Sequence, residues 1–431
     1  MSNTTINKGW KKNAFILYYL LLLGIFFTWH DFQNTPGFGL RLAYFSLVAG
    51  PLFFINKDWT VPIVTLFYIL ARENYTSSYL PTELYTYIFL LLAISIVRGR
   101  NKLFGEIPLV VFILFAITLF CNLFFGTFEN VTGILFLMIL ALQTGGANDA
   151  MTTKYLSYSF IVAGVVIAVY QIQYGEMMAV DTWMGTDQIE RQGFKDINYT
   201  ACVISLGVCA AMINIFVEKK LNKIWKLALV SSIPLMVYSL FVNASRGSIL
   251  AVALPALVLL MFSKTSLWLK IGSVLFVVLA LFVAYDYGVM DYLLFRMEND
   301  STGTGRTEIW ERAWNQYSMS QNALNMLFGY GYEGGRNLIH RAFHNDFLAF
   351  LLEYGFIGFC CFIAFFFRPL YKISKVNRAI TIAAVSALLA VSMTLEPFAA
   401  GRWPYFAFWL YALGLGKYGC NPIRKSLEKT L

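Results

Sequence analysis

Long apolar runs recur along the whole of this 431-residue chain, and they restrict the folds that it can adopt. Hydrophobic residues make up 58% of the sequence and charged residues only 13%, whereas soluble domains carry roughly 25% charged residues. One water-soluble core cannot hide so much apolar surface. The sequence therefore predicts an all-α, polytopic membrane helix bundle, with about 12–14 transmembrane helices of roughly 17–25 residues each.

The candidate spans were located from the apolar runs alone. They lie near residues 14–29, 38–55, 60–72, 81–97, 107–125, 131–146, 153–174, 199–217, 225–242, 247–263, 267–285, 346–367, 379–395 and 402–418. The third run is short and the second contains Arg41, so twelve or thirteen spans are alternatives to fourteen. The first run follows a basic start, but no small-residue cleavage site comes after it, which favours a retained helix over a signal peptide.

Basic residues are divided unevenly between the loops. With the N-terminus placed in the cytoplasm, the inner loops hold 22 of the 33 Lys and Arg residues, which favours two cytoplasmic termini and an even number of spans. The inner set is 17 Lys and 5 Arg, whereas the outer set is 10 Arg and 1 Lys. Because a guanidinium binds phosphate or carboxylate through two parallel hydrogen bonds, the outer set predicts an anion-binding face. For any single arginine, pairing with an outer Asp or Glu is the alternative.

One polar stretch, residues 296–358, begins and ends at apolar runs, and we expect the functional site to lie in it. Within it, residues 306–319 have helical periodicity, and the preceding STGTG is typical of a turn. The stretch predicts an amphipathic helix on the outer membrane surface or against the bundle. Its apolar stripe is Ile309, Trp310, Ala313, Trp314 and Tyr317.

Two arginines have neighbours that suit an anion. Arg246 lies in the sequence ASRGS, whose small residues let an anionic group approach the backbone. Arg306 begins the amphipathic helix, where unpaired backbone amides also favour anions. Each has a simpler alternative, because Arg246 can serve as a topological charge at the lipid boundary and Arg306 can pair with a nearby Glu.

His344 ends the polar stretch and precedes the next span. Its ordinary pKa near 6.5 suits proton transfer at neutral pH. His340 lies four residues earlier, but without an HExxH motif or a third ligand the pair does not predict a metal site. Asn345 or Asp346 is expected to cap the helix that follows. Glu353, about 13 Å further along that helix, is either a functional carboxylate or a partner for another helix.

The order of several motifs resembles the bacterial O-antigen ligase and O-antigen polymerase superfamily. The motifs are RQGFKDINYTA at 191–201, SRGSILA at 245–251, GRTEIW at 305–310, LFGYGY at 327–332 and HNDFLAFLLEYGFIG at 344–358. The implied organisation has three parts. These are N-terminal transmembrane helices at 1–190, a ligase/polymerase-like core at 191–367 that includes a periplasmic loop at 286–345, and C-terminal helices with a cytoplasmic tail at 368–431.

The resemblance implies an inverting glycosyltransferase that uses no metal and no other cofactor. Its donor would be a glycan on undecaprenyl pyrophosphate. The acceptor would be another lipid-linked glycan for a polymerase, which we favour, or lipid A-core for a ligase. Carried over by motif, Arg246 and Arg306 would bind pyrophosphate and His344 would be the catalytic base. Arg191 and Arg341 would be further substrate-binding residues.

The same resemblance places the protein in the bacterial inner membrane, with its active site at the periplasmic face. Its partners would be membrane lipid and the lipid-linked substrates, and no nucleic acid. Two other classes of function stay open. A solute transporter would place polar groups at mid-membrane, as Arg41, Glu353 and Glu396 allow, whereas a non-catalytic assembly scaffold would tolerate the loss of His344. The gathering of polar residues at the outer loop favours the enzyme.

The segment Gly329–Gly334 has the spacing GxGxxG. No predicted strand precedes it, so it does not predict a dinucleotide site. We interpret it as a flexible Gly/Tyr loop whose tyrosines suit stacking on sugar rings.

Overall fold

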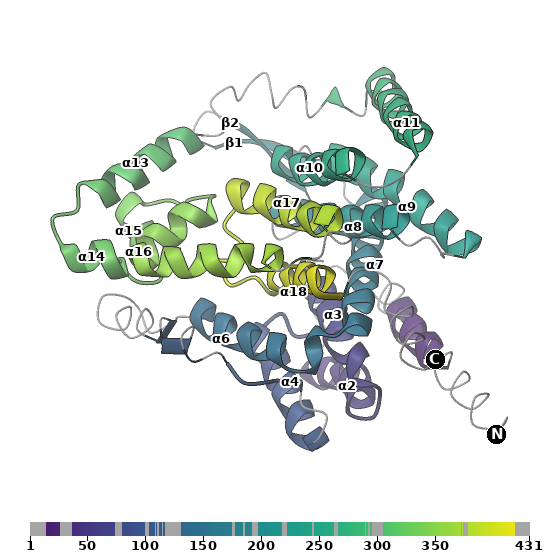
Figure 1. The fold of residues 1–431 in the computed structure, drawn as a ribbon. Coiled ribbons are helices and arrows are strands. Elements are labelled where there is room, and N and C mark those ends of the chain that lie inside the picture. The colour runs from purple at the N-terminus through teal and green to yellow at the C-terminus, as the bar shows by residue number, and fades with distance from the viewer. Residues whose placement is uncertain are drawn as a thin grey trace.

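A computed structural model of the chain describes thirteen main segments, together with a few single residues between them. The segments are residues 14–25, 37–73, 80–99, 103–107, 131–174, 177–183, 186–191, 197–217, 222–243, 245–262, 266–288, 305–371 and 378–418. Helices dominate these segments, and the predicted all-α membrane fold class is confirmed (Figure 1).

The helices follow one another along the chain with short connections. After a first helix at Ala14–Ile25 come α2 (Phe38–Ala49), α3 (Thr60–Glu73), α4 (Leu84–Arg98), α6 (Val131–Thr144), α7 (Ala150–Tyr174), α8 (Ile197–Val217), α9 (Lys223–Val242), α10 (Arg246–Phe262), α11 (Leu267–Asp286), α13 (Arg306–Ser318), α14 (Ala323–Phe328), α15 (Gly334–Ile339), α16 (Asp346–Phe367), α17 (Arg378–Thr394) and α18 (Trp403–Tyr418). Short 3-10 turns are η1 (Gly50–Phe53), η2 (Lys57–Trp59), η4 (Gly146–Asn148) and η5 (Arg368–Leu370).

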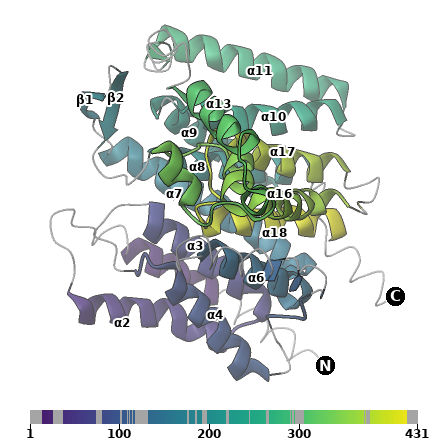
Figure 2. The same cartoon turned by 90° about the vertical axis from the view of Figure 1, so that its left-hand side faces the viewer.

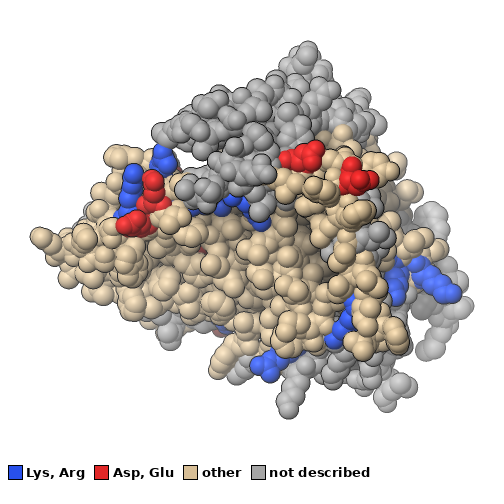
Figure 3. Space-filling view, turned by 90° about the horizontal axis from the view of Figure 1, so that it is seen from above, with Lys and Arg blue, Asp and Glu red and all other residues tan. Residues whose placement is uncertain are grey.

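Four described helices are long and apolar enough to cross a membrane. They are Ala150–Ile172, Ile197–Phe216, Lys223–Val242 and Asp346–Leu370, and six shorter apolar helices accompany them. The total of 12–14 spans stays a prediction, because several expected spans, such as 107–125, lie partly outside the described residues. Seen from above, most of the described surface consists of uncharged side chains, and basic and acidic side chains lie together at one end (Figure 3).

The centre of the bundle is α8. In its apolar span 89% of the residues are buried, whereas only 28% are buried in α9, which exposes Trp225 and Leu227 at its surface. Glycines let α7 and α8 cross closely, since a Cβ added at Gly207 would lie 3.4 Å from the Cα of Gly164. Small residues at helix crossings are typical of membrane bundles, where close backbone contact replaces the hydrophobic effect as the source of stability.

The loop between α7 and α8 contains a hairpin that the sequence did not predict. Strand β1 (Met177–Trp183) pairs antiparallel with β2 (Thr186–Arg191), and Trp183 lies opposite Thr186 at the turn. A polar loop with no alternation of apolar and polar residues gives no strand signal, so this element was missed.

The loop helices, which we define as α13, α14 and α15, lie together at one end of α16 (Figures 1 and 2). The predicted amphipathic helix is confirmed as α13, and Ile309 and Ala313 of its apolar stripe are buried. Trp310 donates a 2.9 Å hydrogen bond from Nε1 to the carbonyl of Phe343. Trp314, by contrast, is 54% exposed and does not pack into the bundle with them.

Helix α16 is broken within its apolar run at Gly355, where φ is 67° and ψ is −172°. Tyr330 donates its backbone N–H to the carbonyl of Leu352 at 2.8 Å, and Gly331 donates to that of Glu353 at 2.9 Å. A Cβ added at Gly355 would lie 2.4 Å from the backbone nitrogen of Gly329. The Gly/Tyr segment therefore satisfies carbonyls next to the kink, and our interpretation of it as a flexible loop is wrong.

Candidate functional site

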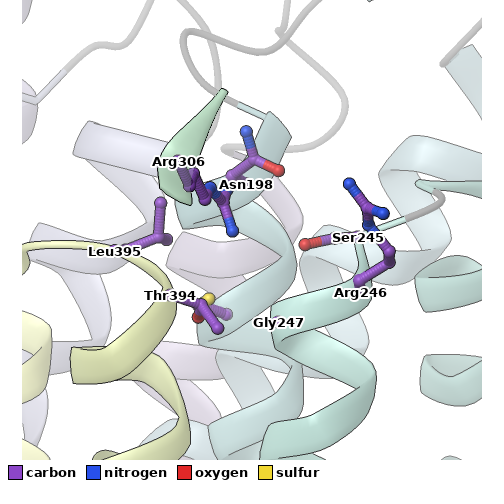
Figure 4. Close-up of a pocket in the computed structure, with 8 residues that line it drawn as sticks. Asn198, Ser245, Arg246, Gly247, Arg306, Thr394 and Leu395 are labelled. Carbon is purple, nitrogen blue, oxygen red and sulfur yellow. The ribbon is translucent and has the colours of Figure 1, made fainter. Parts of the chain in front are cut away.

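Four helix ends meet around one pocket. The start of α8 contributes Asn198 and Cys202, the start of α10 contributes Ser245, Arg246 and Gly247, the start of α13 contributes Arg306, and the end of α17 contributes Thr394 and Leu395. Arg306 and Asn198 lie on one side of this pocket and Ser245 and Arg246 on the other (Figure 4). The structure thus brings Arg246 and Arg306, which are far apart in the sequence, to one place.

The backbone adds positive potential to the two guanidinium groups. Three of the four helix ends are N-termini, whose backbone N–H groups carry a partial positive charge and attract anions. Helix α13 starts after Gly305, at φ 71°, without a hydrogen bond from a capping side chain. About 290 Å³ of space, open solvent included, lies between the lining residues.

Close helix contact shapes the base of the pocket. A Cβ added at Gly247 would lie 2.3 Å from Oγ1 of Thr394, so α10 and α17 meet here through a residue without a side chain. The hydroxyls of Ser245 and Ser248 lie 2.9 Å apart, and the latter lies 3.3 Å from Sγ of Cys202 on α8. These contacts fix the first turn of α10, which begins at Arg246.

A buried amide pair holds the turn before Arg246. Asn243 donates from Nδ2 to Oε1 of Gln171 at 2.8 Å, and Gln171 donates in return to Oδ1 of Asn243. Ser239 also donates to Oε1 of Gln171. Because all three side chains are buried, breaking one bond would leave polar atoms without partners in an apolar surrounding. The position of Arg246 therefore depends on α7 as well as on α9 and α10.

His344 lies in a left-handed backbone conformation at the entrance to α16. Its φ is 50°, and the other non-glycine residues with positive φ in the described part of the chain are Glu333 and His340. A non-glycine residue keeps such a conformation only where the surrounding structure holds it, and residues of this kind cluster at functional sites. Asn345 caps α16 by accepting hydrogen bonds from the amides of Phe347 at 2.9 Å and of Leu348 at 3.2 Å. Of the two expected cap residues, Asn345 and Asp346, it is therefore the first that caps the helix.

The charge state of His344 follows from its surroundings. Burial, together with the positive charges of Arg306 and Arg336, lowers its pKa to about 4. The imidazole is therefore neutral at physiological pH, which is the form that accepts a proton. The electrostatic influence of Arg306 also links His344 to the pocket that Arg306 lines.

An ion network lies beside His344. Nη2 of Arg336 is 2.9 Å from Oε1 of Glu396, and Nε of Arg336 is 3.7 Å from Oε1 of the fully buried Glu353. The sequence analysis allowed a transport role for both glutamates and, for Glu353, pairing with another helix, but it did not identify their shared arginine. The signal was present, because a carboxylate in an apolar run requires a nearby cation, but the sequence did not say which of the outer arginines would supply it.

The remaining predicted residues lie around the same end of the bundle. Arg341 reaches the start of α13, since a Cβ added at Gly305 would lie 3.6 Å from its Nη1. Arg191 ends strand β2. His340 follows α15 and is exposed. Among the residues that the structure describes, no group of three or more His, Cys, Asp or Glu side chains is placed to hold a metal ion.

The sequence of this region matches a known family. A family model described as O-antigen ligase matches residues 231–363. This segment is an O-antigen ligase-family domain. It runs from α9 into α16 and contains Arg246, Arg306 and His344, so the superfamily inferred from the motifs is confirmed. Members of the family are glycosyltransferase-like membrane enzymes that act on lipid-linked glycans. No curated protein matches the chain.

Proposed function

We propose that the protein is an inverting membrane glycosyltransferase. It moves a glycan from undecaprenyl pyrophosphate onto an acceptor hydroxyl at the periplasmic face of the inner membrane. The main support is the pocket in which Arg246 and Arg306 face three helix N-termini, because this arrangement suits a pyrophosphate. The two guanidinium groups supply the positive charge, so the proposed chemistry uses no metal and no cofactor.

The proposed step is a direct displacement at the anomeric carbon. The acceptor oxygen forms a bond to this carbon while the bond to the pyrophosphate oxygen breaks, and the electron pair leaves with the pyrophosphate. Arg246 and Arg306 stabilise the charge that develops on the leaving oxygen. The acceptor proton passes to the neutral imidazole of His344. Attack from the face opposite the leaving group inverts the configuration.

The donor itself would strengthen the base. With the pocket empty, burial and the positive charges of Arg306 and Arg336 lower the pKa of His344 to about 4. A bound pyrophosphate adds negative charge beside Arg306, which raises the pKa of His344 and makes proton transfer from a hydroxyl more favourable. In this proposal, the base becomes effective only when the donor is in place.

Two acceptors supply the required hydroxyl. A second lipid-linked glycan would make the protein a polymerase, which the sequence interpretation favours. Lipid A-core would make it a ligase, and this second candidate is supported by the description of the matched family model. A transporter is less well supported, because Glu353 and Glu396 share Arg336 as an ion-pair partner and do not line the pocket.

The proposal is tested by two matched substitutions. His344→Asn and His340→Asn alter histidines with φ of 50° and 57°, a conformation that asparagine tolerates. We expect His344→Asn to reduce surface polysaccharide by about 100-fold or more, while His340→Asn retains it. Arg246→Ala is expected to be as inactive as His344→Asn, with each variant at the parent level in the membrane. Normal surface polysaccharide in both His344→Asn and Arg246→Ala would rule out the mechanism.

The acceptor is identified from a deletion strain. Single repeat units on the lipid A-core would show that a polymerase has been lost. Absence of any capped core, with long lipid-linked chains accumulating, would show that a ligase has been lost.

A further inference from the structure

Two carboxylates tie the His344 segment to the segment that follows α17. Glu396 accepts a 3.0 Å hydrogen bond at Oε2 from the amide of Phe343. Asp346 accepts hydrogen bonds at Oδ1 from the amides of Phe398 at 3.0 Å and Ala399 at 2.8 Å. Each segment therefore supplies a carboxylate to the backbone of the other, and His344 lies between the two points of attachment.

The backbone before His344 is held on both sides. The amide of Phe343 donates to Glu396, and its carbonyl accepts from Nε1 of Trp310 on α13. Phe343 is fully buried, and Glu396 is 3% exposed. A φ of 50° at His344 is a conformation that a non-glycine residue keeps only when its surroundings impose it. The two hydrogen bonds restrain Phe343, the residue immediately before this conformation.

Arg336 holds Glu396 in this arrangement. The two oxygens of Glu396 have separate partners, because Oε1 lies 2.9 Å from Nη2 of Arg336 while Oε2 accepts from Phe343. Burial alone raises the pKa of Glu396, and Arg336 opposes that effect by favouring the carboxylate. The guanidinium thus favours the carboxylate form of Glu396, whose other oxygen accepts from the backbone beside His344.

Glu396 also adjoins the pocket, because Thr394 and Leu395 line it. We infer that Glu396, oriented by Arg336, is a positioning residue that fixes His344 relative to the anion pocket. This inference rests on the proposed function. Glu396 touches no substrate, and its loss would misplace the base while Arg246 and Arg306 stay able to bind pyrophosphate. A displacement of the base by about 1 Å is enough to cost roughly 100-fold in rate.

The experiment separates donor binding from transfer. Glu396→Ala removes the acceptor for the Phe343 amide, whereas Glu396→Gln keeps one oxygen that can accept this bond. Glu333→Gln is the control, since Glu333 lies 3.7 Å from Nη1 of Arg336 and is 47% exposed. Purified proteins in nanodiscs are titrated with undecaprenyl pyrophosphate, and surface polysaccharide is measured in the deletion strain.

We expect Glu396→Ala to make about 100-fold less polysaccharide while it binds undecaprenyl pyrophosphate like the parent. Glu396→Gln should make at least about ten-fold more polysaccharide than Glu396→Ala, and Glu333→Gln should match the parent. Parent-level polysaccharide in Glu396→Ala would overturn the inference. So would Glu396→Gln being as poor as Glu396→Ala, or loss of lipid pyrophosphate binding in Glu396→Ala. Activity of His344→Asn would instead refute the proposed function, whatever Glu396 does.

Discussion

The two ends of α7 lie at two different kinds of charged surface. Its last turns carry Gln171, which holds the turn before Arg246, so this is the end of the bundle with the pocket, here named the site end. Its first residue, Ala150, follows a cluster of Lys57, Asp58 and Asp149 at the opposite end. The 25 residues of α7 separate these ends by roughly 38 Å.

The two ends differ in which groups lie against the free backbone N–H groups at the helix N-termini. At the opposite end, Asp149 caps α7 by accepting a 2.7 Å hydrogen bond from the amide of Thr152, and Nζ of Lys57 lies 3.9 Å from the same carboxylate. At the site end, α10 begins on Arg246 itself, and α13 begins on Arg306 without a side-chain cap. At the opposite end a carboxylate of the chain caps the helix start, whereas at the pocket α13 starts on an arginine without a side-chain cap. This difference supports our proposal that the site end binds an anion from outside.

The largest effect should come from removing a site-end charge. Arg306→Gln keeps the length and polarity of the side chain but loses its positive charge, and we expect transfer to fall by about 100-fold. Lys57→Gln removes a charge at the opposite end and should leave transfer near the parent level. Polysaccharide measured in the deletion strain compares the two. An equal loss in both variants would show that the site end has no special role.

The second test concerns the pH dependence of transfer. His344 accepts a proton only when neutral, so transfer should decline as pH falls through its pKa, which burial, Arg306 and Arg336 lower to about 4 in the protein without donor. Removing the charge of Arg306 raises this pKa towards its ordinary value near 6.5.

In kcat/KM profiles of purified protein, the acid limb of Arg306→Gln should therefore lie at higher pH than that of the parent. Arg306→Lys keeps the charge and should keep the limb in place. An acid limb at the same pH in all three proteins would mean that His344 is not the titrating base.

The smallest effect is expected at the opposite end and concerns stability. Burial and the nearby Asp149 raise the pKa of Asp58 to about 6. Above that pH the folded protein carries a charge that its surroundings disfavour, while below about pH 4 the penalty is absent. Asp58→Asn should therefore raise the Tm by about 2 °C at pH 7.5, and by less at pH 5.

Glu308→Gln is the control for this measurement, because Glu308 forms an exposed pair with Arg312 at 3.8 Å and exposed pairs add little stability. A lower Tm for Asp58→Asn at pH 7.5 would show that the charge of Asp58 stabilises the folded protein, contrary to its raised pKa.

Much of the fold was predictable from hydropathy. The expected spans 153–174, 247–263 and 346–367 agree closely with α7, α10 and α16. Apolar run length fixes where a membrane helix lies, because the bilayer leaves few alternatives for the backbone. It does not indicate where a helix breaks. The kink at Gly355 depends on the Gly/Tyr segment packed against it, and that contact joins residues distant in the sequence.

The candidate site was predictable in its residue types but not in its supports. Residue type and motif order pointed to Arg246, Arg306 and His344, and the structure places the two arginines on one pocket and His344 under the influence of Arg306. The roles of these residues stay predictions. The parts that were missed are tertiary pairs, such as Arg336 with Glu396, because hydropathy and motifs carry no information on which distant side chains meet.

The attachment of the Gly/Tyr segment to α16 also bears on how the enzyme would respond to its lipid environment. Helix α16 carries His344 immediately before its first turn, and through Tyr330 and Gly331 it holds the loop helices near its midpoint. A membrane of different thickness changes the tilt of a spanning helix. Because His344 and the loop helices are attached to the same part of α16, such tilting would move them together and preserve the distances between them. Bilayer thickness would instead change the distance from His344 to Arg246 on α10.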